Sequence, residues 1–251
     1  MKVLVADENT RVDDAFLDKE KPLRIINSCR GRDHIDYEAC HERGVQVTEI
    51  DYEPANSVAD HAVAMLLQLT VLNPKARGAD GEELAGKKAL VIGGGEIGTR
   101  IQARLYGFGV ETRYYDPYIP EEYEELFHTL REGLEWCDYA FLACPLTPEN
   151  KHLIGYQEFL RLKGKVLINI ARAELVDPYY LGLFANPLRN PGLVRIGWDF
   201  ARELQAEDWK AREVLLHAQA AGTAVVTAHE AWRTREAVAR REKAVKEARK
   251  E

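Results

Sequence analysis

Three glycines, Gly93, Gly95 and Gly98, have the spacing at which a polypeptide binds the pyrophosphate of a dinucleotide. The first glycine of such a group permits a tight turn, and the second lets the pyrophosphate approach the backbone. The third lets the following helix pack closely on the strand, and the N–H groups of that helix attract the phosphates. Glycine clusters also occur in ordinary turns, so the flanking residues must decide between the two interpretations.

The residues on either side of this cluster favour a dinucleotide. Residues 88–93, KALVIG, have the apolar pattern of a buried strand, and residues 96–109 have the pattern of an amphipathic helix. A second predicted strand, 110–116, ends in Asp116, about 20 residues after the glycines, where a carboxylate accepts hydrogen bonds from the ribose hydroxyls of NAD. The same carboxylate would repel the additional phosphate of NADP. FAD uses the same glycine pattern, so NAD needs further support.

Short apolar runs alternate with helical patterns along most of the chain, which predicts an α/β fold with a doubly wound parallel sheet. We expect a helix over 57–69, with Ser57 as its N-cap and Asp60 at the capping-box position. Residues 73–86 are loop-like, and the charged segment 237–251 is predicted to be a solvated surface helix. The predicted strands are 2–6, 24–28, 45–50, 88–93, 110–116, 139–144, 166–171, 193–200 and 224–229.

The composition narrows the classes of function. The chain has 251 residues, 46% of them hydrophobic, and a net charge of −7, which argues against a nucleic-acid partner. We expect no membrane-spanning segment and no signal peptide. The four cysteines have no zinc spacing and are expected to be thiols of a cytoplasmic protein, and the histidines show no metal-ligand pattern.

Six segments, in this order, together resemble the D-isomer-specific 2-hydroxyacid dehydrogenases, whose members include D-lactate and 3-phosphoglycerate dehydrogenases and glyoxylate reductases. The resemblance covers about residues 24–238, and the order of the segments is far more specific than any one of them. The segments are GRDHIDYEACHERGVQVTE, SVADHAVAMLLQL, GGGEIG, PLTPENKHLI, LINIARAELVD and VVTAHEAWRT.

The resemblance implies two domains and NAD as the cofactor. A dinucleotide-binding domain over 53–229 would be inserted within a reduced, flavodoxin-like substrate domain formed by 1–52 and completed by 230–251, with the substrate in the cleft. The cofactor contacts expected from the matching motifs are Gly93, Gly95, Glu96, Ile97, Gly98, Asp116, Pro145 and Asp199.

The same resemblance implies the residues of the reaction. Arg172, in NIAR, corresponds to the catalytic arginine of the family, whose planar guanidinium grips the oxygens of a 2-keto acid. His229, in TAH, corresponds to the histidine that gives a proton to the alkoxide left after hydride transfer. Arg30 and Gly31 lie in the segment whose backbone holds the substrate carboxylate in the family.

The sequence departs from the family pattern at the glutamate that keeps this histidine protonated. The family places it five residues after a strand-end Asp, here Asp199, but position 204 is Leu. Either Glu203, one residue early, serves instead, or the histidine lacks its partner. The protein is therefore expected to interconvert a small 2-keto acid and its D-2-hydroxy acid with NAD(H), as a homodimer like its relatives. The alternatives are a non-catalytic NAD(H)-binding sensor or interaction protein and, third, a different oxidoreductase of the same fold.

Overall fold

The computed structural model describes residues 2–7, 10–29, 31–32, 34–51, 53–72, 81–120, 126–186, 194–199 and 209–250. The chain forms two compact units, the first from residues 1–54 and 232–251 and the second from residues 55–231. From the sequence we expected these boundaries at 52 and 229. Among the described residues, no helix is long and apolar enough to cross a membrane.

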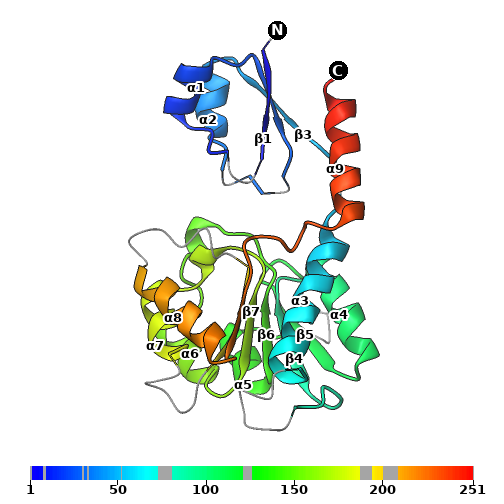
Figure 1. Ribbon diagram of the computed structural model, residues 1–251, viewed down its shortest axis with the longest axis vertical. Coiled ribbons are helices and arrows are strands. Elements are labelled where there is room, and N and C mark those ends of the chain that lie inside the picture. Colours follow the sequence, from blue (N-terminus) through cyan, green and yellow to red (C-terminus); the bar gives the residue numbers. More distant parts are fainter. Residues whose placement is uncertain are drawn as a thin grey trace. The chain divides into compact units, whose positions relative to one another are not determined.

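The first unit is built on a small parallel sheet in the order β1-β2-β3 (Val3–Ala6, Arg24–Asn27, Gln46–Glu49). Because both crossovers run in the same direction and parallel crossovers are right-handed, α1 (Asp14–Glu20) and α2 (Tyr37–Glu42) cover the same face. The other face is covered by α9 (Arg235–Ala248) (Figure 1). Neighbouring residues of β2 divide between the faces: Ile25 packs with α1 and α2, and Ile26 packs with α9.

The second unit is a six-stranded parallel sheet in the order β5-β4-β6-β7-β8-β9. The chain moves from β4 outward to β5, then returns past β4 to β6 and continues in one direction. Right-handed crossovers therefore place α4 on one face and α5 to α8 on the other. The strands are β4 (Lys88–Ile92), β5 (Glu111–Tyr115), β6 (Tyr139–Leu142), β7 (Val166–Asn169), β8 (Arg195–Trp198) and β9 (Ala224–Val226).

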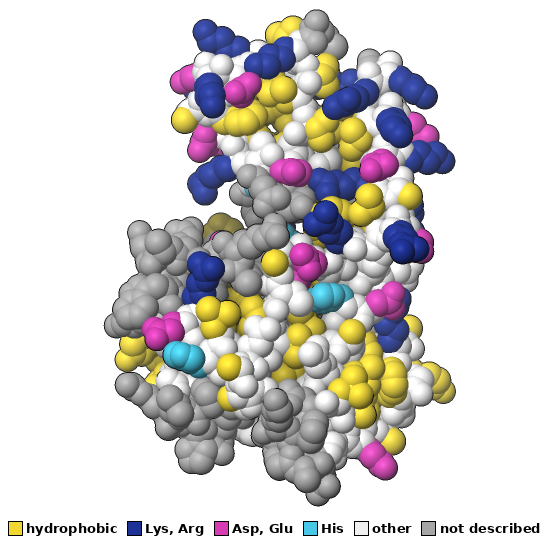
Figure 2. All heavy atoms as spheres, in the orientation of Figure 1, with side chains coloured by type: hydrophobic (Ala, Val, Ile, Leu, Met, Phe, Trp, Pro, Cys, Tyr) yellow, Lys and Arg dark blue, Asp and Glu magenta, His cyan; other side chains and the backbone are white. Residues whose placement is uncertain are grey.

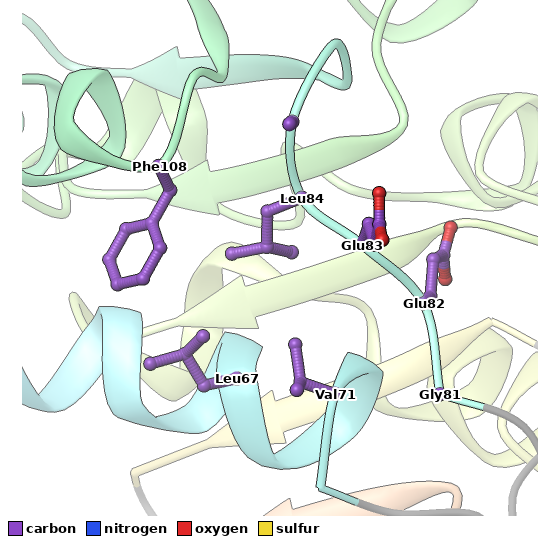
Figure 3. A pocket seen from close by; sticks show the side chains of 8 residues that line it. Leu67, Val71, Gly81, Glu82, Glu83, Leu84 and Phe108 are labelled. Atoms are coloured by element: carbon purple, nitrogen blue, oxygen red, sulfur yellow. The ribbon is translucent and has the colours of Figure 1, made fainter.

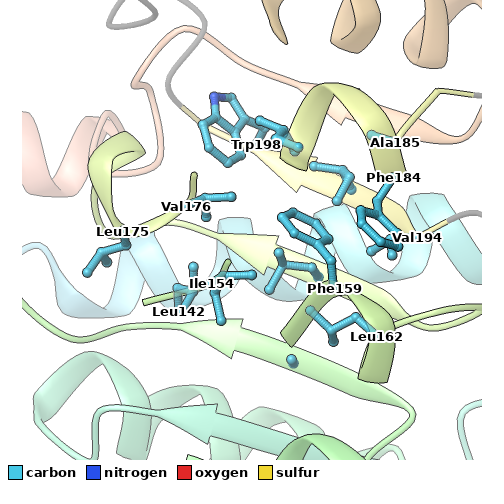
Figure 4. Close-up of a cluster of buried hydrophobic side chains, with 14 of the residues drawn as sticks. Leu142, Ile154, Phe159, Leu162, Leu175, Val176, Phe184, Ala185, Val194 and Trp198 are labelled. Carbon is cyan, nitrogen blue, oxygen red and sulfur yellow. The ribbon is translucent and has the colours of Figure 1, made fainter. Parts of the chain in front are cut away.

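Helices bury both faces of this sheet, which explains the continuous apolar runs of its strands. α3 (Ala55–Thr70) and α4 (Glu96–Gly107) pack against one another on one face. On the other face, side chains such as Phe159, Phe184 and Trp198 form a large hydrophobic core (Figure 4). The helices of that face are α5 (Leu130–Trp136), α6 (Tyr156–Arg161), α7 (Pro178–Phe184) and α8 (Trp209–Ala220), with short 3-10 turns at Pro148–Asn150 and Ala173–Leu175.

The α/β fold and its doubly wound parallel sheet are as the sequence predicts, but one local expectation is wrong and another is incomplete. α3 begins at Ala55, so Ser57 and Asp60 lie inside the helix and do not cap it. Pro54 has a backbone angle that is already suited to a helix start, and Asp60 instead pairs with Arg104 of α4 at 2.5 Å.

The incomplete expectation concerns α9, which is a mostly exposed surface helix as predicted but also covers one face of the small sheet. It carries many Lys and Arg residues, several of which are visible in Figure 2. Its small apolar side chains nevertheless pack with Ile26 and Ile50 of the first unit: they are Ala244, Val245 and Ala248. The charge of the segment therefore hid an apolar stripe.

Candidate active site

The turn between β4 and α4 requires glycine at two of its three motif positions. Gly93 has φ +103°, and a Cβ there would lie 2.7 Å from the backbone nitrogen of Cys144, at the end of β6. A Cβ on Gly98 would lie 2.1 Å from the carbonyl oxygen of Gly93. As the motif implies, α4 can approach the strand closely because neither glycine has a side chain.

Gly95 is different, because it is exposed and a Cβ there would meet no atom within 4 Å. It is also the N-cap of α4, and no side chain caps this helix. The N–H groups of the first turn are therefore offered to a ligand outside the chain, beside a backbone with no side chain in the way. Both features fit the pyrophosphate of a dinucleotide. Glu96, exposed, and Ile97, half-buried, begin the helix.

Asp116, directly after β5, holds the turn from the side. Its carboxylate accepts one hydrogen bond from the Gly94 N–H and one from the Tyr118 N–H, each at 2.9 Å. A carboxylate offers about four acceptor positions, so these bonds leave capacity for the hydroxyls of a ribose. The neighbouring Cys144 is a free thiol whose pKa burial raises to about 11, with a smaller contribution from the charge of Asp116. It is therefore not a nucleophile at neutral pH.

The predicted residues of the second unit lie along one edge of its sheet. Parallel strands share a direction, so the residues that follow them meet at the carboxyl edge, where open α/β sheets bind ligands. In the order of the strands across the sheet, these residues are Asp116 after β5, Gly93 after β4, Pro145 after β6, Arg172 after β7, Asp199 after β8 and His229 after β9. The strand before Arg172 lies two strand spacings, about 10 Å, from the strand before the glycines.

Arg172 lies at the end of a loop that follows β7. The side chain of Asn169, the last residue of β7, closes this loop. The side-chain oxygen of Asn169 accepts the Ala171 N–H at 3.0 Å, and its amide nitrogen donates to the Arg172 carbonyl at 2.8 Å. The Arg172 guanidinium itself donates to the Ala171 carbonyl at 2.8 Å. Ala171 and Arg172 are both half-buried, so the loop carries a cation that is partly exposed to solvent.

His229 occupies the left-handed region of the backbone, at φ 57°, which is uncommon for a residue with a side chain. Asp199, 1% exposed, fixes this segment on both sides of the histidine. Its carboxylate accepts the Thr227 hydroxyl at 2.5 Å and the N–H groups of Glu230 and Ala231, each at 2.9 Å. A conformation that costs about 1–2 kcal/mol is thus held in place by a buried charge.

Sequence patterns alone do not reveal the part that His61 plays in this arrangement. From the middle of α3, its Nε2 lies 3.1 Å from the Thr227 hydroxyl and 3.6 Å from the carboxylate of Asp199. Partners so distant in sequence leave no local pattern. Glu203, the predicted partner of His229, lies outside the described residues. Among the described residues, no group of three or more His, Cys, Asp or Glu side chains could hold a metal ion.

In the first unit, Gly31 follows β2 and is half-buried, while Arg30 lies outside the described residues. A cavity of about 470 Å³ opens at the same carboxyl edge of the three-stranded sheet. Asp7 and Ser28, which follow β1 and β2, line it together with Trp232 and Arg241. The Arg241 guanidinium lies over the Trp232 ring, 4.6 Å from its centroid, and donates to the Ser28 hydroxyl at 2.7 Å.

A doubly wound sheet with a glycine turn, an uncapped helix and a strand-end acid defines a dinucleotide-binding α/β protein. Comparison with known proteins gives the family. Residues 67–231 match the model of the D-isomer specific 2-hydroxyacid dehydrogenase NAD binding domain, and the chain belongs to this family.

Individual relatives support the same assignment. The chain is 33% identical to a D-3-phosphoglycerate dehydrogenase of Methanocaldococcus jannaschii over 70% of its own length, and 29% identical to a D-lactate dehydrogenase of Escherichia coli over 94%. It spans 37% of the first relative and 78% of the second. A crystal structure of D-lactate dehydrogenase from Aquifex aeolicus, in complex with NAD and lactic acid, has a TM-score of 0.82 at 27% identity. The similarity covers 99% of this chain and 82% of that one.

Proposed function

We propose that the protein transfers a hydride between NAD(H) and a small 2-keto acid or its D-2-hydroxy acid. The observation that carries this proposal is the placement of Arg172 and His229 after β7 and β9, on the sheet edge that also bears the glycine turn. Bound at this turn, the nicotinamide cofactor would supply the hydride. Arg172 and His229 are then the groups of the second unit that act on the substrate.

The chemistry gives each group a separate task. A 2-keto acid presents a carboxylate beside a carbonyl, and the planar guanidinium of Arg172 can orient these oxygens through several N–H donors. Reduction of the carbonyl leaves negative charge on its oxygen, and His229 donates the proton that neutralises it. The hydrogen bonds from the Glu230 and Ala231 N–H groups to Asp199 hold the backbone segment that carries the imidazole. Asp199 also remains a proposed cofactor contact, as do Glu96, Ile97 and Pro145.

Two further assignments rest on the family resemblance. Glu203 is proposed to support the protonated form of His229, because position 204 is Leu and carries no charge. Arg30 and Gly31 are proposed to bind the substrate carboxylate. We also propose that the protein is a homodimer and that it is cytoplasmic. A measurement of its mass in solution tests the homodimer.

A shallow apolar pocket of about 400 Å³ marks one surface that such a dimer could bury. It lies in the second unit, between the C-terminal end of α3 and the segment that precedes β4. Figure 3 shows Leu67, Leu84 and Phe108 around it, with the carboxylates of Glu82 and Glu83 on its other side.

A panel of 2-keto acids tests the function directly. Glyoxylate, hydroxypyruvate, pyruvate, phosphohydroxypyruvate and bulkier analogues are offered with NADH, and oxidation of the nicotinamide is followed by its absorbance. Turnover of any of them supports the proposal and identifies the substrate. Tight NADH binding without turnover of any of them would reject it in favour of a non-catalytic NAD(H)-binding protein, an alternative that the missing glutamate at position 204 favours.

Asp116 is expected to make the protein prefer NADH to NADPH by roughly 10- to 100-fold in affinity, because an unpaired phosphate beside a carboxylate costs about 1–3 kcal/mol. The Asp116→Ala variant should narrow this ratio. It also removes the acceptor of the Gly94 and Tyr118 N–H groups, so its affinity for NADH should itself fall. Fluorescence titration of both cofactors gives the ratio, and equal affinities in the parent protein contradict the assignment of Asp116.

A further inference from the structure

Asn27, the last residue of β2, closes the loop that follows this strand. The residue is completely buried, at 0% exposure. Its side-chain oxygen accepts the Cys29 N–H at 3.0 Å, and its amide nitrogen donates to the Gly31 carbonyl at 3.0 Å. One carboxamide therefore holds the loop of residues 28–31, which we call the 28–31 loop, near its beginning and at its end.

The same arrangement holds Arg172 in the second unit. Asn169 also ends its strand, is 0% exposed, accepts the N–H two residues later and donates to a carbonyl at the far end of its loop. The loop after Asn27 differs in having one more residue before that carbonyl. Thus the two loops to which the proposed function assigns substrate contacts are closed in the same way, in two different units of the chain.

We infer that Asn27 is a positioning residue for substrate binding: by holding the Gly31 carbonyl, it sets the direction in which the peptide unit of Gly31 and Arg32 faces the substrate carboxylate. This inference rests on the proposed function. The physical reason is the planar peptide unit, in which the carbonyl and the next N–H point in opposite directions. With the Gly31 carbonyl turned toward Asn27, the N–H of Arg32 is turned away from it. An N–H fixed in this way is the type of donor that binds a carboxylate.

The carboxylate of Glu49, at the end of β3, determines which way the carboxamide of Asn27 is oriented. The Asn27 amide nitrogen donates to Glu49 Oε2 at 2.9 Å, so the reversed orientation would set two oxygens against each other. The Tyr37 hydroxyl donates to the other oxygen of Glu49. Burial, followed by this hydrogen bond, raises the pKa of Tyr37, so the hydroxyl stays protonated as a donor. Arg32 lies over the Tyr37 ring, 4.5 Å from its centroid.

The Asn27→Asp variant tests the inference because it separates the two hydrogen bonds by which Asn27 closes the loop. A carboxylate still accepts the Cys29 N–H, but it cannot donate to the Gly31 carbonyl, and it faces Glu49. We expect the KM for the best 2-keto acid to rise roughly tenfold, since one positioning hydrogen bond is lost. The kcat and the Kd for NADH should stay within about threefold of the parent values, because His229 and the glycine turn are unchanged. The Kd of oxamate, a non-reducible analogue, for the NADH complex should rise with KM.

Ile25→Val is the matched control. Ile25 lies on the same strand, is equally buried, and its change removes one methylene without touching the loop. It should leave KM and the oxamate Kd at the parent values. If Asn27→Asp changes them no more than Ile25→Val does, the inference is overturned while the proposed function stands.

Two other outcomes are also decisive. If the parent protein reduces no 2-keto acid, the proposed function fails, and the inference fails with it. If Asn27→Asp does not fold, Asn27→Ser, which adds no buried charge, takes its place with the same expected rise. If neither variant folds, Asn27 serves the fold alone and the inference is overturned.

Discussion

The His229→Gln variant is expected to bind NADH as tightly as the parent protein and to reduce its best 2-keto acid about 10²–10⁴-fold more slowly. This factor corresponds to about 3–5 kcal/mol of barrier, the value of a positioned general acid. The loss should appear in kcat, because the proton is needed only in the chemical step. Initial rates with saturating NADH measure it, and a fluorescence titration with NADH confirms that the variant is folded.

The backbone of His229 calls for a second variant as a control. At φ 57° a glutamine is strained, whereas asparagine tolerates the left-handed region well. His229→Asn should therefore lose as much rate as His229→Gln, but it should not suffer the loss of stability that the strained backbone causes in His229→Gln. A rate near that of the parent in either folded variant means that the TAH motif records shared ancestry without a shared mechanism.

Arg172→Lys is expected to behave differently from the histidine variants. A lysine keeps the charge but has no planar set of donors, so its hold on the substrate weakens. The KM for the keto acid should then rise in addition to any fall in kcat. A variant that loses kcat alone would assign Arg172 to the chemical step and not to binding of the substrate.

The Gly98→Ala variant is expected to lower the free energy of unfolding by about 3 kcal/mol, the upper part of the range for an overfilled core. The added carbon would lie 2.1 Å from the Gly93 carbonyl oxygen and 3.0 Å from Cγ1 of Val91. Because the first of these atoms belongs to the backbone of the turn, α4 must move away from the strand. Denaturant titration of the cofactor-free protein measures the loss.

Gly95→Ala, three residues earlier in the same turn, is the matched control. Its added carbon meets nothing within 4 Å, so the free energy of unfolding should change by less than about 1 kcal/mol. The methyl group instead fills the space proposed for the pyrophosphate, and NADH affinity should fall at least about tenfold. Unchanged NADH binding in this variant would place the phosphates elsewhere.

The sequence predicts much of this fold because both sheets are covered on both faces. Stretches such as 89–92 and 139–142 must then be apolar throughout, and such runs between helical patterns are easily recognised. The errors arose where a distant partner outweighed a local rule. Ser57 has the chemistry of an N-cap, but it is buried within α3, which begins after Pro54. α9 looked solvated until the sheet that its apolar stripe covers was known.

The candidate site shows the same division. Gly93, Gly98, Arg172 and His229 belong to short motifs, so their positions on the sheet edge follow from the strand that precedes each one. The groups that hold these residues in place cannot be predicted in this way, because Asp199 and His61 contact the His229 segment from positions far away in the chain. Asn27 was missed for another reason: a strand-end asparagine is common, and only its hydrogen bonds to both ends of the following loop distinguish it. The catalytic roles themselves stay predictions until the variants are measured.

The position of α9 in the chain has a consequence for biosynthesis. This helix covers one face of the β1-β2-β3 sheet, but all of the second unit is translated between β3 and α9. At about 5–20 residues per second, the nascent sheet waits roughly 10–40 s for its cover. During that time Val3, Val5 and Ile26 lack the side chains against which they finally pack. The second unit can therefore fold while the first is still incomplete, and an apolar face of the β1-β2-β3 sheet stays uncovered until α9 has been translated.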